Sequence, residues 1–279
     1  MNTLKRKVIH FILNIMTWVI VFIVIFPLVW MFLSSIKQPG EVYAYPPILF
    51  SRRPTLLNYI ELFKVTNFEK YFINSIIVTL STVVITMITV IITTYSLTRF
   101  RIWGGNVLSR LYVIIYLIPH IVMIIPIFLM MKTFHLLNNL FSLIITYLIF
   151  TFPYSYLLMR AYIGSIDPSI EEAALIDGAS RIGAFVKVLL PVAVPGIVAT
   201  SIFTAILCWN EYLFALVLVP QENVKTLTVG VAGLTEKTGI PSWGMLMAAA
   251  VVVVLPMIIF FVIVQRKIVI GLSAGAVKG

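Results

Sequence analysis

Apolar residues along this chain gather into six long stretches that are separated by more polar segments. The hydrocarbon core of a bilayer is about 30 Å thick, and a helix that rises about 1.5 Å per residue needs about 20 apolar residues to cross it. Barrel strands would alternate with a period of two, whereas the run from Val78 to Ile92 is apolar or Thr nearly throughout. We therefore predict an all-α integral membrane protein with six transmembrane helices, over residues 11–35, 71–97, 107–131, 140–160, 194–219 and 244–265.

The composition agrees with a membrane protein. Apolar residues make up 61% of the 279 residues and charged residues 11%, against about 25% charged residues in soluble domains. The first stretch follows Lys5, Arg6 and Lys7 and in this resembles a signal peptide. Its apolar run is too long for one, and no small-x-small cleavage site follows, so we expect it to stay as a membrane anchor. Cys208 is the single cysteine, which rules out an intrachain disulfide.

The positions of Lys and Arg predict that both termini lie in the cytoplasm, because cytoplasmic loops carry an excess of these residues. This orientation places twelve of the 20 basic residues inside, namely Lys5, Arg6, Lys7, Arg99, Arg101, Arg110, Arg160, Arg181, Lys187, Arg266, Lys267 and Lys278. The net charge of +10 then reflects topology and attraction to anionic membrane lipid. We expect no nucleic-acid partner.

The segment between the fourth and fifth crossings, residues 160–192, is polar and cannot cross the bilayer. Each charge at the membrane centre costs about 2.5–3.5 kcal/mol, and the segment contains seven: Arg160, Asp167, Glu171, Glu172, Asp177, Arg181 and Lys187. Asp167 is a natural N-cap, Pro168 suits the first helical position, and Gly178 suits the left-handed residue that ends a helix. We predict a short helix from Asp167 to Ile176 on the cytoplasmic side.

A second short helix is expected to start after Ser180 and to end at Pro191. Its apolar residues fall on one face, at Ile182, Phe185, Val186, Leu189 and Leu190. Two interpretations of this pair of helices remain open at this point. It could rest on lipid as an interfacial hairpin, or it could dock a soluble partner, with Ala173 and Ala174 allowing close approach beside an acidic residue.

The motif in this segment resembles the EAA loop of bacterial ABC importer permeases. The matching residues are Glu172-Ala173-Ala174, then Gly178 after three residues, then Val188, Leu189, Leu190 and Pro191 after nine more. Asp177, Gly178 and Ala179 extend the likeness toward the carbohydrate branch of the family. Further matches are Trp209-Asn210-Glu211, Trp243-Gly244, and a tail from Gly271 to Gly279 that resembles the end of the smaller permease subunit of maltose transporters.

The resemblance implies one transmembrane permease domain over residues 1–279, with the type I ABC importer permease fold, in the bacterial cytoplasmic membrane. It implies import of a carbohydrate, which we expect to be an oligosaccharide, by alternating access. The implied partners are a second homologous permease subunit, a dimer of ATPase subunits and an extracytoplasmic sugar-binding protein. Residues implied to couple to the ATPase are Glu171, Glu172, Ala173, Ala174, Asp177, Gly178 and Ala179 in the cytoplasmic loop, and Ala274, Gly275, Ala276, Val277, Lys278 and Gly279 in the cytoplasmic tail over residues 266–279.

No enzymatic activity and no cofactor are expected in this chain, so ATP and Mg would bind to the partner ATPase. Gly178 and Gly183 have the spacing of a nucleotide-binding loop, but Ala184 and Phe185 follow where Lys and Ser or Thr are required. Three scattered His residues do not form a metal site.

Polar residues inside the predicted crossings are candidates for a translocation path, because ionisable groups there usually face the bundle interior or a wet cavity. Glu211 is the one acidic residue in a predicted crossing, and a structural hydrogen-bonding role is weighed equally for it. Pro119 would bend the third crossing. The candidates for the path are Trp209, Asn210, Glu211 and Pro119.

Other classes of protein fit the sequence less well. A secondary transporter would show inverted repeats and ionisable groups at mid-membrane, and an intramembrane enzyme would show paired acidic residues or a His cluster. Within the family, another solute such as a glycerol phosphate ester is the alternative to a carbohydrate.

Overall fold

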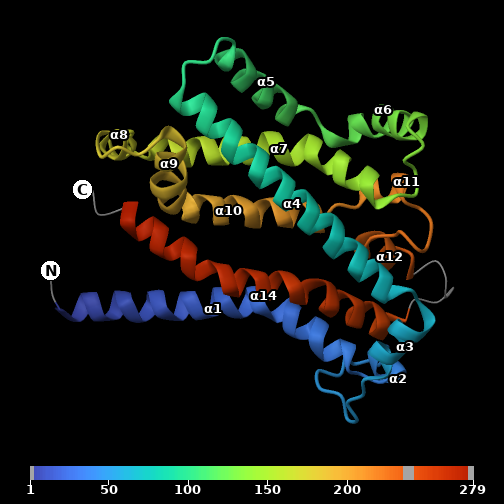
Figure 1. Cartoon of the computed structure of the whole chain (residues 1–279). Coiled ribbons are helices and arrows are strands. Elements are labelled where there is room, and N and C mark those ends of the chain that lie inside the picture. The colour runs from blue at the N-terminus through green and yellow to red at the C-terminus, as the bar shows by residue number, and fades with distance from the viewer. Residues whose placement is uncertain (1–2, 235–241, 276–279) are drawn as a thin grey trace. The chain divides into compact units, whose positions relative to one another are not determined.

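The structure, a computed structural model, describes residues 3–234 and 242–275. Throughout these ranges the regular structure is helical (Figure 1), which confirms the predicted all-α class. Five helices are long and apolar enough to span a bilayer: Ile9–Ser35, Phe68–Arg99, Leu140–Ser165, Arg181–Trp209 and Trp243–Ile263. A bent pair of helices supplies a sixth span if the pair is counted as one.

That bent pair corrects the third predicted crossing, residues 107–131. Instead of one helix, the structure has α5 (Gly105–Leu117) and α6 (His120–Thr133), which meet at an angle of 100°. Ile118 and Pro119 between them are extended, with ψ of 122° and 127°. The proline ring disfavours helical backbone at the residue before it, so Pro119 ends α5 rather than merely kinking it.

The structure divides into two compact units, and the first contains residues 1–68 and 231–255. It includes α1 (Thr3–Ser35), α2 (Pro39–Val42), α3 (Leu57–Val65) and the first part of α14 (Trp243–Gly275). The buried side chain of Asn58 on α3 donates to the carbonyl oxygens of Ser35 and Lys37, at 2.8 and 2.9 Å. A Cβ at Gly244 would lie 2.5 Å from the same amide. The start of α14 can therefore lie this close to α3 only because residue 244 is a glycine.

Lys37, just beyond α1, is a buried basic residue in this unit. Its ammonium lies 4.3 Å from the centre of the Trp30 ring. Burial lowers the pKa of Lys37, while the negative charge of Glu41 acts in the opposite direction.

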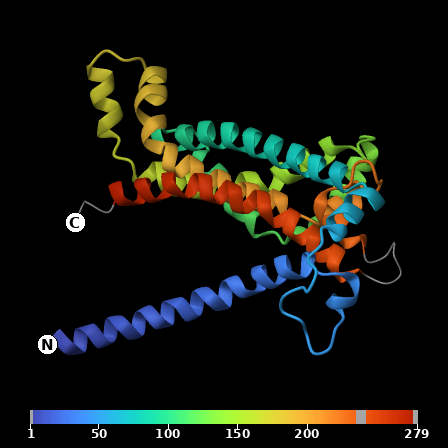
Figure 2. The ribbon, with the colours of Figure 1, turned by 90° about the horizontal axis from the view of Figure 1, so that it is seen from below.

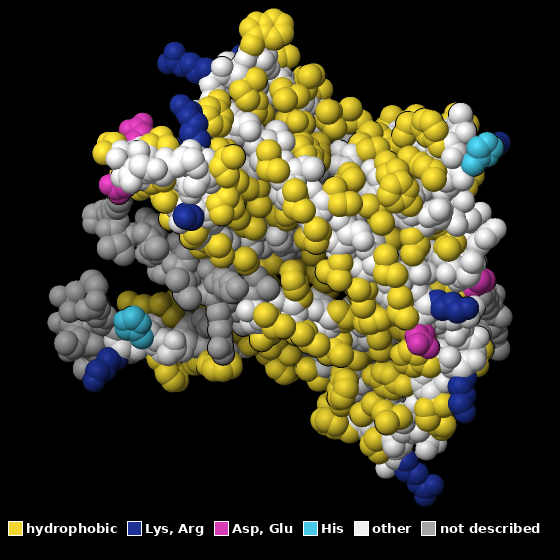
Figure 3. Space-filling model, viewed as in Figure 1, with side chains coloured by type: hydrophobic (Ala, Val, Ile, Leu, Met, Phe, Trp, Pro, Cys, Tyr) yellow, Lys and Arg dark blue, Asp and Glu magenta, His cyan; other side chains and the backbone are white. Residues whose placement is uncertain are grey.

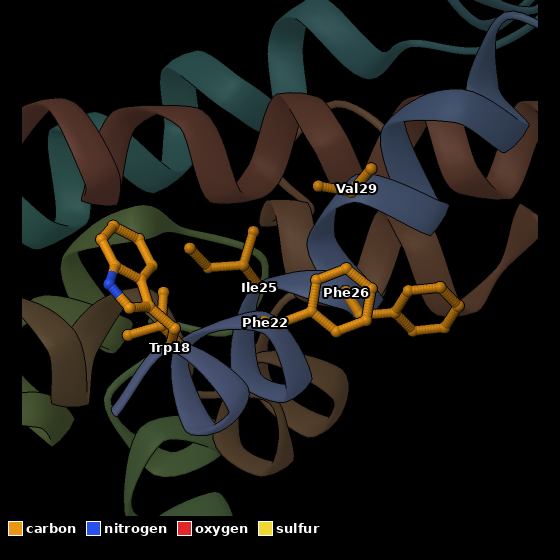
Figure 4. A pocket seen from close by; sticks show the side chains of 6 residues that line it. Trp18, Phe22, Ile25, Phe26 and Val29 are labelled. Atoms are coloured by element: carbon orange, nitrogen blue, oxygen red, sulfur yellow. The ribbon is translucent and has the colours of Figure 1, made fainter. Parts of the chain in front are cut away.

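The membrane-spanning part of α1 exposes its apolar side chains on all sides. Trp18 is 72% exposed and Phe22 69%. Figure 4 shows these side chains around a shallow apolar hollow on one side of the helix, lined by Trp18, Val21, Phe22, Ile25, Phe26 and Val29. Such a surface is stable in contact with lipid or with another apolar helix, and not with water.

The second unit contains residues 69–230 and 256–279. Its long helices are α4 (Phe68–Arg99), α7 (Leu140–Ser165) and α10 (Leu190–Trp209), and α7 packs against both α5 and α10. The shorter elements are α8 (Ser169–Ile176), α9 (Arg181–Ala184), a π-helical turn η1 (Phe185–Leu189), α11 (Leu213–Leu218) and α12 (Leu227–Ala232). Figure 2 shows α8 standing beside α9 and η1 at one end of this unit.

Pairs of hydroxyl groups join the long helices of the second unit. Thr86 of α4 pairs with Thr151 of α7 at 3.0 Å, and Ser155 of α7 pairs with Thr204 of α10 at 2.8 Å. All four side chains are buried. Small hydroxyl residues at these positions let the helix backbones approach closely, which is how transmembrane helices associate.

Gly196 is a point of close contact between α7 and α10. A Cβ added to Gly196 of α10 would lie 2.3 Å from the ring of Tyr162 of α7. A Cβ at Gly164 of α7 would instead meet nothing within 4 Å. We predict that Gly196→Ala lowers thermal stability by about 1–3 kcal/mol through overpacking. The control Gly164→Ala is expected to melt at or above the wild-type temperature. Thermal unfolding of the purified protein in detergent, followed by fluorescence-detected gel filtration, measures both, and equal melting of the two variants would contradict this packing.

Candidate functional site

The helix α8 in the predicted cytoplasmic loop begins as the sequence indicates. The side chain of Asp167 accepts a hydrogen bond from the backbone N–H of Ser169 at 2.9 Å. Pro168 already has helical backbone angles, with φ −59° and ψ −24°. Asp167 therefore caps the helix, and Glu171 and Glu172 lie in its first turn, where the helix dipole favours negative charge.

Gly178 ends α8 in the predicted left-handed conformation, with φ +87°. Its N–H bonds to the carbonyl of Leu175 at 3.1 Å, and the N–H of Ala179 bonds to that of Ala174 at 3.0 Å. This pair of bonds is the Schellman arrangement, which satisfies the last carbonyl groups of the helix. A side chain at Gly178 would meet open space, so any cost of substitution comes from the backbone angle and amounts to about 1–2 kcal/mol.

The second predicted helix starts correctly but does not end at Pro191. Ser180 caps α9 by accepting from the N–H of Gly183 at 3.1 Å. The helix then continues through η1 into α10. Within η1 the N–H of Leu190 bonds to the carbonyl of Phe185, five residues back. This wider turn accommodates the ring of Pro191, which would otherwise press against a carbonyl of the preceding turn.

The two glutamates of α8 have different surroundings. Glu171 is buried and forms an ion pair with Arg99, at 2.7 Å between Oε1 and Nε, in which the side chains are 9% and 10% exposed. Arg99 is the last residue of α4. Glu172, Ala173, Asp177 and Gly178 are exposed, and Ala174 and Ala179 are half-buried. Sequence reasoning did not assign Arg99 to this site, and its one signal was a basic residue just beyond the predicted crossing over residues 71–97.

The ion pair borders a hollow of about 210 Å³ between α4, α8 and α9. It is lined by Tyr95, Arg99, Phe100, Pro168, Glu171, Glu172, Leu175, Arg181 and Ala184. The ring of Tyr95 lies 4.4 Å from that of Phe185 and covers one side. Nearby, Ile176 and Ile182 are 86% and 76% exposed. Figure 3 shows acidic side chains over α8, at the edge of a largely hydrophobic face. The outer surface of the loop therefore combines negative charge with exposed aliphatic groups.

Glu211 lies in a break between α10 and α11, where the predicted fifth crossing was continuous to residue 219. Its carboxylate accepts hydrogen bonds from the Tyr147 hydroxyl at 2.7 Å and from the N–H groups of Phe214 and Ala215 at 2.8 and 3.1 Å. It thus caps α11 and ties it to α7. This geometry fits the structural role that was weighed for Glu211, and a role in a translocation path stays a prediction.

The other three candidates for the translocation path differ from one another in burial and in contacts. Trp209 is buried and meets the edge of the Phe72 ring at 6.1 Å between centres. Asn210 is exposed and donates to the carbonyl of Ile206 at 2.9 Å. Pro119 is exposed at the corner between α5 and α6.

The predicted tail is described only in part. α14 continues as a helix to Gly275, beyond the end expected for the sixth crossing at residue 265. Ala274 and Gly275 are its last residues, and Ala276, Val277, Lys278 and Gly279 lie outside the described residues.

Comparison with known proteins shows the class to which this fold and loop belong. Residues 91–271 match the family of binding-protein-dependent transport system inner membrane components. The chain is 32% identical to the diacetylchitobiose uptake system permease protein DasC of Streptomyces coelicolor, over 99% of this chain and all of that protein. It is 29% identical to the trehalose/maltose transport system permease protein MalG of Thermococcus litoralis, over 99% of this chain and all of that protein.

A solved structure has the same fold over nearly the whole chain. It is a chain of a bacterial ABC transporter involved in the import of the acidic polysaccharide alginate, with a TM-score of 0.80 and 25% identity, covering 95% of this chain and 98% of that one. The matched region is well over half of the 279 residues. The protein belongs to the family of binding-protein-dependent transport system inner membrane components, and it is a multi-pass protein of the cytoplasmic membrane.

The three hydrogen bonds that the Glu211 carboxylate accepts are expected to stabilise the fold. Glu211→Ala would leave the buried Tyr147 hydroxyl and two N–H groups without their acceptor, which costs about 1–3 kcal/mol. Asn210→Ala removes one bond at an exposed site and is expected to change stability by less than about 0.5 kcal/mol. Cys208 is buried nearby and is the single cysteine, so its reaction with a maleimide dye during heating reports opening of this region. Equal reaction temperatures for the two variants would refute the structural role.

Proposed function

We propose that this chain is the permease subunit of an ATP-driven importer for a carbohydrate, and that it takes its energy from a separate ATPase through α8. The observation that carries the proposal is α8 itself. It is a helix capped at both ends, fixed to the end of α4 through Glu171, and exposed along Glu172, Ala173 and Asp177. A rigid, acidic, exposed helix is suited to insertion into a cleft of another protein. Membership of an importer family supports an ATPase as that protein.

In the proposed mechanism, α8 follows the ATPase subunits when they close on ATP. The helices that are joined to α8 then rock between inward-open and outward-open states. ATP and Mg bind to the ATPase, and this chain works as one permease domain without a nucleotide site of its own. Trp209, Asn210, Glu211 and Pro119 all remain candidates for the translocation path, and Glu211 also joins α11 to α7 at the break after α10.

The proposed complex has three further kinds of contact. A second homologous permease subunit would cover apolar surface such as that of α1, where lipid does not. An extracytoplasmic sugar-binding protein would deliver the substrate, and the family's dependence on a binding protein supports this contact. The tail from Ala274 to Gly279 would contact the ATPase dimer in the cytoplasm.

Reversing the charge of Glu172 tests the coupling site. We expect Glu172→Lys to weaken binding of the ATPase to the tagged chain by about a hundredfold or more, so that co-purification is largely lost, because reversing a charge at a buried dock costs at least the roughly 3–5 kcal/mol of a broken buried pair. Transport-coupled ATP hydrolysis should fall with it. Glu61→Lys, on the exposed surface of α3, makes the same change of charge away from the loop and should leave assembly unchanged. Wild-type assembly and hydrolysis in Glu172→Lys would discard the proposed dock.

The class of substrate is tested by uptake. Relatives named for diacetylchitobiose and for trehalose/maltose support a di- or oligosaccharide. Host cells lacking this chain should lose ATP-dependent uptake of at least one radiolabelled sugar from a panel of chitobiose, maltose, trehalose and alginate oligosaccharides, and should regain it with the wild-type gene. Loss of glycerol 3-phosphate uptake instead, with every sugar unaffected, would favour the alternative of a glycerol phosphate ester.

A further inference from the structure

We infer that Arg99 is a positioning residue that links α8 to the membrane helices, so that the Arg99–Glu171 ion pair transmits movement of α8 to α4 and α7. The inference rests on the proposed function, because it names the part of the chain that would transmit the force. It concerns a contact within this chain, between residues 72 positions apart, and not the surface that faces the ATPase.

The guanidinium of Arg99 contacts two other elements at once. Its Nε donates to Oε1 of Glu171 in the first turn of α8, at 2.7 Å, and its Nη2 donates to the carbonyl oxygen of Ile166, at 2.9 Å. Ile166 is the capping residue directly after the end of α7. Arg99 itself ends α4, so one side chain joins the ends of two long helices to the start of α8. Arginine can do this because its planar group presents several donors in fixed directions.

The helix dipoles reinforce this arrangement. A positive charge is favourable at the C-terminal ends of α4 and α7, and a negative charge is favourable in the first turn of α8. All three dipoles therefore stabilise the charges as they are placed. If the two charges were exchanged, each charge would be destabilised by the dipole of the helix end beside it.

Burial makes the pair a strong link. The two side chains are only about a tenth exposed, and the aromatic contact of Tyr95 with Phe185 lies beside them. A second ion pair among the described residues of this unit, Lys225–Glu222, is a local contact between residues three apart, with side-chain exposures of 17% and 39%. Interactions between charges are much stronger where water is excluded, so Arg99–Glu171 resists separation in a way that the local pair does not.

The two adjacent glutamates of α8 would then have separate roles. Successive residues of a helix point about 100° apart, and here Glu171 is buried against Arg99 while Glu172 is exposed. A partner that binds the exposed surface of α8, which includes Glu172, would pull on α4 and α7 through the buried Glu171. Without the pair, α8 would keep its connecting residues, its contacts with α9 and η1, and the contact of Glu171 with the Tyr95 side chain, but it would lose its charged link to the end of α4.

A distance measurement tests the link without requiring transport. Spin labels are placed at Asp177 of the loop and Ile92 of α4, both exposed, in a chain with Cys208→Ala, reconstituted in lipid nanodiscs. We expect a narrow distribution of distances in the background chain and broader ones in Arg99→Gln and Glu171→Gln. Arg99→Lys, which keeps the charge but loses the planar fork, should fall between them. Glu222→Gln, which removes the local pair, should match the background. Equal widths in all variants would overturn the inference.

Coupling in the intact complex is the second measurement. Arg99→Gln and Glu171→Gln keep the exposed face of α8, so both should still co-purify with the ATPase. Uptake per ATP hydrolysed should fall by about tenfold, which corresponds to about 1.4 kcal/mol. The double variant should do no worse than either single one, because each single change leaves a buried charge unpaired.

Wild-type coupling in the single variants would reduce the pair to a structural contact and overturn the inference. A wild-type chain that binds no ATPase would instead refute the proposed function, while the spin-label distances would still test the link.

Discussion

Helices inside a bilayer gain little by hiding apolar surface from one another, because lipid tails are as apolar as their side chains. The association of α4, α7 and α10 therefore depends on close approach and on buried hydroxyl pairs. Gly196 lets the Tyr162 ring rest directly on the backbone of α10. Thr86–Thr151 and Ser155–Thr204 satisfy polar groups that lipid could not. Apolar clusters around Tyr147 and Tyr156 fill the remaining space.

This close packing gives α8 a rigid base. The cluster around Tyr156 includes Ile163 and Leu189, near the ends of α7 and η1, and Tyr95, Ile166 and Phe185 pack against it. The Arg99–Glu171 pair stands beside this cluster, so α8 is attached where the unit is well packed. The caps at Asp167 and Gly178 make α8 stiff in its own right. Stiffness of the helix and rigidity of its base are both required if movement at the surface is to reach the membrane helices.

The sequence predicted features that depend on neighbouring residues and missed those that depend on distant ones. Asp167, Gly178 and Ser180 act locally, and each caps a helix as expected. Apolar runs of about 20 residues identified the spans, because the thickness of the bilayer sets their length. The partner of Glu171 lies 72 residues away and that of Glu211 lies 64 residues away at Tyr147, and no periodicity reveals such pairs. Pro191 was misjudged because a π turn, which depends on packing, can accommodate a proline.

The breaks in the third and fifth predicted crossings differ in how their backbone groups are satisfied. Non-helical backbone at membrane depth is stable only when protein covers it or when it lines water. After α10, the Glu211 carboxylate accepts the first N–H groups of α11, and Thr228 donates to the Glu211 carbonyl at 2.7 Å. That break is closed within the chain. At the corner between α5 and α6, Ile118, Pro119 and His120 are exposed. The N–H of Ile118 bonds to the carbonyl of Ile115 at 3.2 Å, and the carbonyl groups that follow in α5 have no further turn of the helix to bond. This corner therefore needs water or a second protein surface in the membrane, which makes it the better place to look for the wall of a transport cavity.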